Sequence, residues 1–361
     1  MKRFYRTMAS FHKELLVAQL AVKRASILTK KISDEIAAKT TGGISKTDKS
    51  PVTIGDFAAQ AIVINSILKN FPSDEVVGEE DSDLIRQTPG LGQNILEHIQ
   101  NVQNEDKFSS DVLGELSSID SVCSTIDKGD SKGGSSGRIW ALDPIDGTKG
   151  FLRGDQFAVC LALIVDGEVQ LGVIGCPNLL VDLSNPSGKR GGLFSAIRGR
   201  GSYYQNLFEE VKPLDDQRRI FLNNKVSFAE AKVCEGVEKG HSSHELQALI
   251  KEDLNIVSKS LNLDSQVKYC ALARGDAEIY LRLPKDVNYQ EKIWDHAAGN
   301  VLITEAEGVV SDIYGNSLDF GKGRTLQSQG IVASSKTLHA DIIKTIKKII
   351  GENGEELQKY C

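Results

Sequence analysis

FAVCLALIVDGEVQLGVIGCP, residues 157–177, contains two long apolar runs joined by Asp166-Gly167. An Asp-Gly pair between two such runs is a strong signal for a β-hairpin. The runs are apolar at consecutive positions and do not alternate with polar residues. Both faces of the two strands are therefore predicted to be covered, as in a sheet with layers packed on each side.

Helical periodicity dominates the sequence before this hairpin. Apolar residues recur at three- and four-residue spacings from Glu14 to Ile32, which predicts a long amphipathic helix. A second helix is predicted from Asp56 to Lys69, ending before Pro72. A short strand at Val76–Val77 follows.

Residues 81–137 are polar and rich in Ser, Asp and Gly. They are interpreted as a surface excursion with one or two helices and a mobile end. A tolerated insertion and a lid over a site both fit this composition, and the insertion is favoured because long surface loops cost little free energy.

The chain after residue 215 alternates strands with helices, which is typical of an α/β unit with its own sheet. No internal repeat is present. We therefore predict three parts: an N-terminal extension (1–13), an α+β domain with an antiparallel sheet (14–214), and an α/β domain (215–361).

Composition limits the function. The chain has 361 residues and a net charge of −6, which argues against a nucleic-acid or anionic-membrane surface. No apolar run is long enough to span a bilayer. The six cysteines form no CxxC pair, which predicts reduced thiols in a cytoplasmic protein. The basic residues 1–13 fit either a disordered extension or a mitochondrial presequence.

The most informative short motif is LDPIDGT, residues 142–148. It places Asp143 and Asp146 three positions apart, and like charges this close repel unless a cation separates them. Two carboxylates with the Ile145 carbonyl between them form an oxygen donor set that suits Mg²⁺. The motif therefore predicts a magnesium site.

Other acids stand where a strand ends or a helix begins, namely Glu79, Asp56 and Asp295. Capping a helix is the simpler role for the last two. If all of these acids converge, they form a cluster for more than one metal ion, suited to phosphate-ester hydrolysis. Thr148 and Asp56 are then candidates to orient and deprotonate the attacking water.

Four motifs in this order resemble the inositol monophosphatase superfamily of Mg²⁺-dependent, lithium-sensitive phosphatases. They are VTIGD (52–56), GEE (78–80), DPIDGT (143–148) and WDHAAG (294–299). Within that superfamily, the chain is most similar to fungal-type 3′(2′),5′-bisphosphate nucleotidases, through stretches that include EGVEKGHSSH, LDSQVKYC and YQEKIWDHAAGN.

The resemblance implies a layered α-β-α-β-α sandwich with two sheets, and two or three Mg²⁺ ions per site. It implies metal ligands at Glu79, Asp143, Ile145, Asp146 and Asp295 and a water-activating pair at Asp56 and Thr148. It implies substrate contacts at Thr148, His241, Ser265, Lys268, Arg282 and Asp295. The implied reaction converts 3′-phosphoadenosine 5′-phosphate, and its sulfated relative, to products with one phosphate fewer. Roles in sulfur assimilation and salt tolerance follow from the same resemblance.

Several alternatives remain open at this stage. Without the resemblance, Lys268 and Arg282 fit solvated strand residues, and His241 with His244 fits a polar helix start. A haloacid-dehalogenase-type phosphatase also uses paired aspartates, but two positions apart, and it forms a phospho-aspartate. An inositol phosphate or fructose bisphosphate is an alternative substrate, and a catalytically silent ion sensor is the non-enzyme alternative. The oligomeric state is left open, with a monomer allowed.

Overall fold

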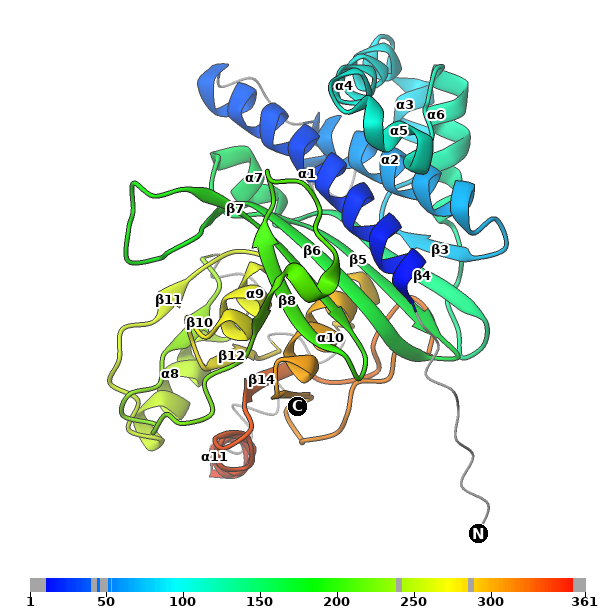
Figure 1. The fold of residues 1–361 in the computed structure, drawn as a ribbon. Helices are drawn as coiled ribbons and strands as arrows, with labels where there is room; N and C mark the ends of the chain where they lie inside the picture. The colour runs from blue at the N-terminus through cyan, green and yellow to red at the C-terminus, as the bar shows by residue number, and fades with distance from the viewer. Residues whose placement is uncertain are drawn as a thin grey trace.

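The computed structural model describes residues 11–39, 44–45, 51–52, 54–237, 242–284 and 289–352. In this part of the chain, two main sheets alternate with layers of helices (Figure 1). The order through the molecule is helix, sheet, helix, sheet, helix, as the separate hydrophobic cores between the layers show. The layered α-β-α-β-α sandwich is therefore confirmed.

The larger sheet has seven strands in chain order from β3 to β9. Its neighbours are antiparallel except at one edge, where β3 and β4 are parallel. The prediction of an antiparallel sheet is wrong at that edge. The strands are β3 (Glu75–Gly78), β4 (Arg138–Asp146), β5 (Ala158–Val165), β6 (Glu168–Leu180), β7 (Arg190–Ile197), β8 (Gly201–Asn206) and β9 (Arg218–Ile220).

The parallel pair explains residues 81–137. Parallel neighbours need a crossover of a dozen or more residues, and this segment provides it. Its buried Ile95, Ile99, Val122 and Ile126 pack beneath Phe57 in one hydrophobic cluster. The prediction of a surface excursion with a mobile end is therefore wrong, because the segment is an ordered helical crossover. Its helices are α3 (Asp83–Gln87), α4 (Leu91–Glu105), α5 (Lys107–Leu113), α6 (Ile119–Ile126) and the 3₁₀ turn η1 (Asp127–Gly129).

Strand β5 shows why the opening hairpin is apolar on both faces. Alternate residues point to opposite sides of a strand. Cys160 and Ala162 face the central core, and Leu161 and Leu163 face the first helical layer. That layer consists of α1 (His12–Lys39) and α2 (Ile54–Asn70), with the short pair β1 (Ile44–Ser45) and β2 (Pro51–Val52) between them in sequence.

The predicted hairpin turn is also confirmed. Asp166 and Gly167 have φ angles of 50° and 80°, and β5 pairs antiparallel with β6. The Asp166 carboxylate accepts a hydrogen bond from the Gly137 amide at 3.1 Å, which ties the turn to the start of β4.

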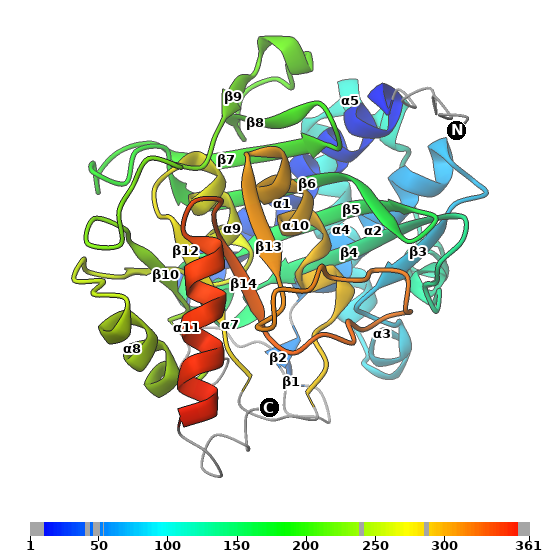
Figure 2. The same cartoon turned by 90° about the horizontal axis from the view of Figure 1, so that it is seen from below.

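The smaller sheet has five strands in the order β11-β10-β12-β14-β13. Its inner face packs on α9 and α10, and its outer face packs on α8 and α11, which lie side by side (Figure 2). Its elements are β10 (Val233–Glu235), α8 (His244–Asp253), β11 (Leu261–Asn262), α9 (Val267–Arg274), β12 (Ile279–Arg282), α10 (Ala297–Glu305), β13 (Gly308–Ser311), β14 (Ile331–Ser335) and α11 (His339–Glu352); η2 (Leu214–Asp216) and η3 (Ile293–Asp295) are 3₁₀ turns.

The two halves share the central core, in which β5 and β6 contribute one side and α9, α10, β12 and β14 the other. Strand β9 belongs to the first sheet although it follows residue 214, so the division at that residue stays a prediction. Among the residues described, five cysteines are free and buried, and no helix is long and apolar enough to cross a membrane.

Candidate active site

The end of β4 carries the two paired aspartates. Residues three apart in a regular strand point to opposite faces. Here the register shifts between Asp143 and Asp146, whose partners on β5 are only two residues apart. This bulge turns both carboxylates into one cavity. Pro144 has no amide hydrogen to donate to the ladder; it lies inside the bulge, and pairing resumes at Asp146.

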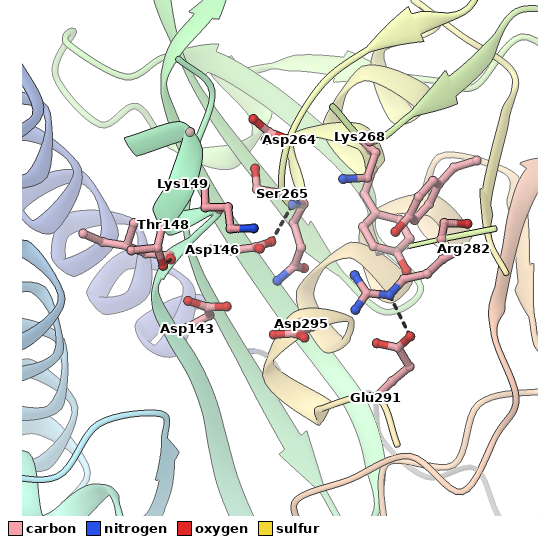
Figure 3. A pocket seen from close by; sticks show the side chains of 18 of the residues that line it. Asp143, Asp146, Thr148, Lys149, Asp264, Ser265, Lys268, Arg282, Glu291 and Asp295 are labelled. Carbon is pink, nitrogen blue, oxygen red and sulfur yellow. Dashed lines mark hydrogen bonds and ion pairs between the residues drawn. The ribbon is translucent and has the colours of Figure 1, made fainter. Parts of the chain in front are cut away.

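A cavity of about 490 Å³ opens at this strand end, where α7 (Thr148–Arg153), α9, β12 and η3 also converge (Figure 3). It gathers residues that are far apart in the sequence. No described residue between 81 and 137 lines it, so nothing supports a lid in that segment. The predicted site residues that line it are Glu79, Asp143, Ile145, Asp146, Thr148, Ser265, Lys268, Arg282 and Asp295.

One wall of the cavity is acidic. Burial raises the pKa of Asp143 well above its usual value, and the charges of Glu79, Asp146, Asp295 and Asp56 raise it further. Burial, and then Asp295, raises the pKa of Asp146 to about 6. Burial raises the pKa of Asp295, whose carboxyl group lies within hydrogen-bond reach of Asp143. This wall needs protons or cations to be stable at neutral pH.

The predicted catalytic pair lies at the edge of this wall. Asp56 is buried in the first turn of α2, behind the cavity lining and close enough to Asp143 to raise its pKa. Thr148 is the first residue of α7, and its hydroxyl donates to the Ile145 carbonyl at 3.3 Å. His241 lies outside the described residues.

The opposite wall carries the cations. Lys268 lies on α9 and is buried, and its ammonium group is 5.3 Å from the centroid of the Tyr280 ring. Arg282 ends β12, and its Nε donates to Glu291 at 2.6 Å. The alternative of solvated strand residues is therefore wrong for Lys268. Ser265, just before α9, has a φ of 62°, a strained angle of the kind found at functional sites.

Comparison with known proteins decides the family. The model of the inositol monophosphatase family matches residues 12–351. The chain belongs to the inositol monophosphatase family. A 3′(2′),5′-bisphosphate nucleotidase 2 of Candida albicans is 54% identical to the chain over 349 residues, covering 94% of it and 98% of the relative. A protein named 3′(2′),5′-bisphosphate nucleotidase from Emericella nidulans is 48% identical, and the match covers 94% of this chain and 99% of the relative. A protein of the same name from Schizosaccharomyces pombe is 44% identical, and the match covers 95% of this chain and 98% of the relative.

Solved structures of inositol monophosphatases share the fold. An IMPase of Thermotoga maritima superimposes with a TM-score of 0.59 at 20% identity, covering 94% of this chain and 99% of that one. A Staphylococcus aureus IMPase-II superimposes with a TM-score of 0.57 at 18% identity, covering 94% and 96%.

Members of this family are generally metal-dependent, and the acidic wall fits a cation. The Asp143 Oδ1 atom is buried and has no hydrogen-bond partner in the part of the chain that the structure describes, although buried acceptors are normally paired. The surrounding donors are carboxylate and carbonyl oxygens, the set that hard divalent ions prefer. Glu291, Asp295 and His296 also place ligand atoms within 4.8 Å of one another.

That second group is better explained as a hydrogen-bonded relay. Glu291 accepts from Arg282 and contacts the His296 Nε2 at 3.1 Å, and the Tyr269 hydroxyl contacts the His296 Nδ1 at 2.8 Å. Arg282 and His296 help to lower the pKa of Glu291 to about 2, against the effect of its burial. The relay keeps Arg282 fixed at the cavity.

Sequence reasoning missed this relay and also Gln266. The Gln266 amide N–H donates to Asp146 at 2.5 Å, and its side chain donates to the Trp294 carbonyl and accepts from the Gly299 amide. One residue therefore connects the two aspartate motifs, through its backbone amide on one side and its side chain on the other. The only signal in the sequence is its position next to Ser265.

Proposed function

We propose that this member of the inositol monophosphatase family removes the 3′-phosphate of 3′-phosphoadenosine 5′-phosphate, giving AMP and phosphate. Its sulfated relative is proposed as a further substrate. One observation carries the proposal: an acidic wall and a wall with Lys268 and Arg282 face each other across a single cavity. A substrate with two phosphates needs a cation site for each, and the names of the curated relatives support the nucleotide.

Two or three Mg²⁺ ions would be held by the carboxylates of Glu79, Asp143, Asp146 and Asp295 and by the Ile145 carbonyl. Bound there, they would supply positive charge to the phosphate and lower the pKa of a water molecule. Each predicted ligand lines the cavity, and the unpaired Asp143 oxygen supports this assignment.

Asp56 and Thr148 have the water-activating role in this proposal. The Thr148 hydroxyl holds the attacking water, and Asp56 takes a proton as the water oxygen bonds to phosphorus. The bond between phosphorus and the 3′-oxygen breaks, and the leaving oxygen takes up a proton from solvent water, so that AMP and inorganic phosphate are released. The position of Asp56 supports this role, because its carboxylate is buried and close enough to Asp143 for its charge to act on that ligand.

The retained 5′-phosphate is proposed to bind Lys268, Arg282 and Ser265. The planar guanidinium suits two phosphate oxygens and the ammonium acts as a point charge. Arg282 carries a pKa raised well above its usual value, chiefly through Glu291, so it stays charged in the cavity. His241 is proposed to contact the base.

The test is a phosphate-release assay with purified protein, with and without Mg²⁺. Activity should be highest on 3′-phosphoadenosine 5′-phosphate and its sulfated form, and low on inositol 1-phosphate and fructose bisphosphate. A faster rate of phosphate release from inositol 1-phosphate would instead identify inositol 1-phosphate as the substrate. Acid quenching with labelled substrate should leave no phosphorylated protein. Retained activity in Asp146→Asn would contradict the catalytic site itself.

Lithium inhibition is part of the same proposal. A small monovalent ion in a site built for Mg²⁺ brings too little charge to neutralise the acidic wall. Activity should therefore fall in roughly ten-millimolar Li⁺, well above typical substrate KM values, while the same concentration of Na⁺ leaves it unchanged. Equal rates in the two salts would contradict this part.

A further inference from the structure

Arg324 lies in the loop between β13 and β14, far in sequence from every residue assigned above. Its Nη2 donates to the Gly78 carbonyl at 2.6 Å. Its Nη1 donates to the carbonyls of Ser131 at 2.9 Å and Gly129 at 3.3 Å. One planar fork therefore joins the end of β3 to the neighbouring turn, and the Gly78 carbonyl belongs to the peptide that begins Glu79.

The same guanidinium also contacts the segment that carries Asp295. Its Cζ atom lies 4.9 Å from the centroid of the Trp294 ring, the residue directly before Asp295. The backbone continues this contact: the Ile293 amide donates to the Arg324 carbonyl at 3.1 Å, and the Leu326 amide donates to the Glu291 carbonyl at 2.8 Å.

The loop is well placed to act as a strap. In Figure 2 it extends from β13 toward the side of β3 and β4. A Cβ at Gly133 would meet the Gly323 backbone at 2.9 Å, so the two loops are in close contact. Glycine is therefore required at position 133. This close approach brings the backbone of Arg324 near both the end of β3 and the segment that carries Asp295.

The other flank of Glu79 is held independently. Gln60 on α2 donates to the Glu80 carbonyl at 2.7 Å and accepts from the Glu80 amide at 2.9 Å. The backbone on both sides of Glu79 is therefore fixed, by Gln60 from the first half and by Arg324 from the second. Of these two contacts, the one made by Arg324 also extends to Trp294, the residue before Asp295.

From these contacts we infer that Arg324 is a positioning residue that sets the relative placement of Glu79 and Asp295, and through it the affinity of the site for divalent cations. The inference rests on the metal site of the proposed function. Arginine is needed because a lysine ammonium cannot bind three carbonyls in a plane and lie on an indole ring at once.

The test measures cation affinity without substrate, by titrating the full-length protein with Mn²⁺ and following the free ion by electron paramagnetic resonance. Arg324→Gln and Arg324→Lys should bind Mn²⁺ about 10- to 100-fold more weakly than the wild type, the range typical of residues that orient metal ligands. Arg198→Gln is the matched control, because Arg198 makes an exposed ion pair with Glu168 away from the cavity, and its affinity should be unchanged.

Kinetics separate positioning from general destabilisation. Raising Mg²⁺ should recover part of the lost rate in the Arg324 variants, while the nucleotide KM changes little, because Lys268 and Arg282 are untouched. A folded Arg324 variant with wild-type Mn²⁺ affinity would overturn this inference alone. Wild-type protein that binds no divalent cation would instead overturn the proposed function, and this inference with it.

Discussion

At the scale of single residues, stability and function conflict most directly at Asp143. Its carboxylate is buried among other acids, which raises its pKa. Ionising it at neutral pH therefore destabilises the folded state. Asp143→Asn keeps the shape but removes the charge. We expect phosphate release to fall by more than about 100-fold, since even residues that only orient ligands contribute 10- to 100-fold.

The same variant should be more stable without metal. In a buffer with a chelator, its Tm should rise by roughly 2 °C. This is the shift that a gain of about 1 kcal/mol in the free energy of unfolding produces in a large domain. Asp341→Asn on the exposed face of α11 is the control: it removes a favourable charge from the first turn of that helix, so its Tm should fall slightly and not rise, and its activity should be unchanged. A lower Tm for Asp143→Asn would show that the acidic wall is not under repulsion.

Gln266 allows a second test at this scale. Gln266→Met fills a similar volume but leaves the Trp294 carbonyl and the Gly299 amide without their partner. Each buried unpaired group costs about 1–3 kcal/mol, so the two together should lower the free energy of unfolding in urea by about 2–6 kcal/mol. Gln93→Met, on the exposed face of α4, should change it by less than about 0.5 kcal/mol. A stable, fully active Gln266→Met would contradict this role.

The predicted and the missed site residues differ in what they bind. The sequence predicts Asp143, Asp146 and Glu79 because they belong to short motifs in which closely spaced negative charges indicate a cation site. Gln266 and Arg324 bind main-chain atoms of distant segments, and no local pattern encodes such a partner. The Asp143–Asp146 bulge was also not predictable in detail, because it depends on the register with β5.

At the scale of elements, the contact between α10 and β6 depends on Gly172. A Cβ there would lie 2.6 Å from the Val301 side chain and 2.8 Å from the Ala298 carbonyl. Gly172→Ala should therefore move α10, cost about 1–3 kcal/mol of stability and lower activity, because Asp295 lies two residues before the start of α10. Gly351→Ala in α11 meets nothing within 4 Å and should be neutral or slightly stabilising. Thermal unfolding and phosphate release measure both effects.

The docking of α11 should depend on pH through His339. Its ring lies between the hydroxyls of Ser311 at 2.9 Å and Ser334 at 2.8 Å, and burial lowers its pKa to about 4. Both hydroxyls also donate to backbone carbonyls, Ser311 to Asp312 at 2.7 Å and Ser334 to Ser335 at 3.2 Å. Because burial disfavours the charged form of the ring, the imidazole of His339 is expected to be neutral in the folded state at about pH 7.

A depressed histidine pKa stabilises the fold above the unfolded value of about 6.5, and this stability is lost as pH falls toward about 4. Between about pH 7 and pH 5 the loss should be about 2 kcal/mol. His339→Asn should flatten this part of the stability curve in urea titrations at several pH values. An unchanged slope would contradict the neutral, buried ring.

The sequence predicts an element well when the residues that the element contacts are close to it in the chain. The hairpin at Asp166-Gly167 is local, so turn chemistry and hydrophobicity were sufficient to predict it. The crossover at residues 81–137 is not, because its polar residues face solvent while a few spaced apolar residues, such as Ile95 and Ile99, make the long-range contacts. Its role appears only once β3 is known to pair with β4.

At the scale of the whole molecule, the active site lies where the two halves share a core. Asp143 and Asp146 come from the first sheet, Lys268 and Arg282 from the second half, and the central core between them contains α9 and α10. The family motifs predicted this convergence, but the spacing of the acids alone did not. The site can therefore be complete only when both halves are folded and docked.

The last prediction couples metal, pH and global stability. Asp146 has a folded pKa of about 6, above its unfolded value, and the pKa values of Asp143 and Asp295 are also raised. For an acid with a raised pKa, the folded state holds its proton more tightly. Without metal, these groups therefore lower stability as pH rises from about 4 through about 6, and the full penalty remains at higher pH.

A divalent cation replaces those protons, so Mg²⁺ should stabilise the protein mainly above about pH 6. We expect a clear rise in Tm with saturating Mg²⁺ relative to a chelator at about pH 7.5, worth about 2.7 kcal/mol at a hundred times the Kd. At about pH 5 the rise should be much smaller, because protons compete for the same oxygens. Asp143→Asn should abolish the difference between the two pH values. An equal Mg²⁺ effect at both pH values would place the cation somewhere other than the acidic wall.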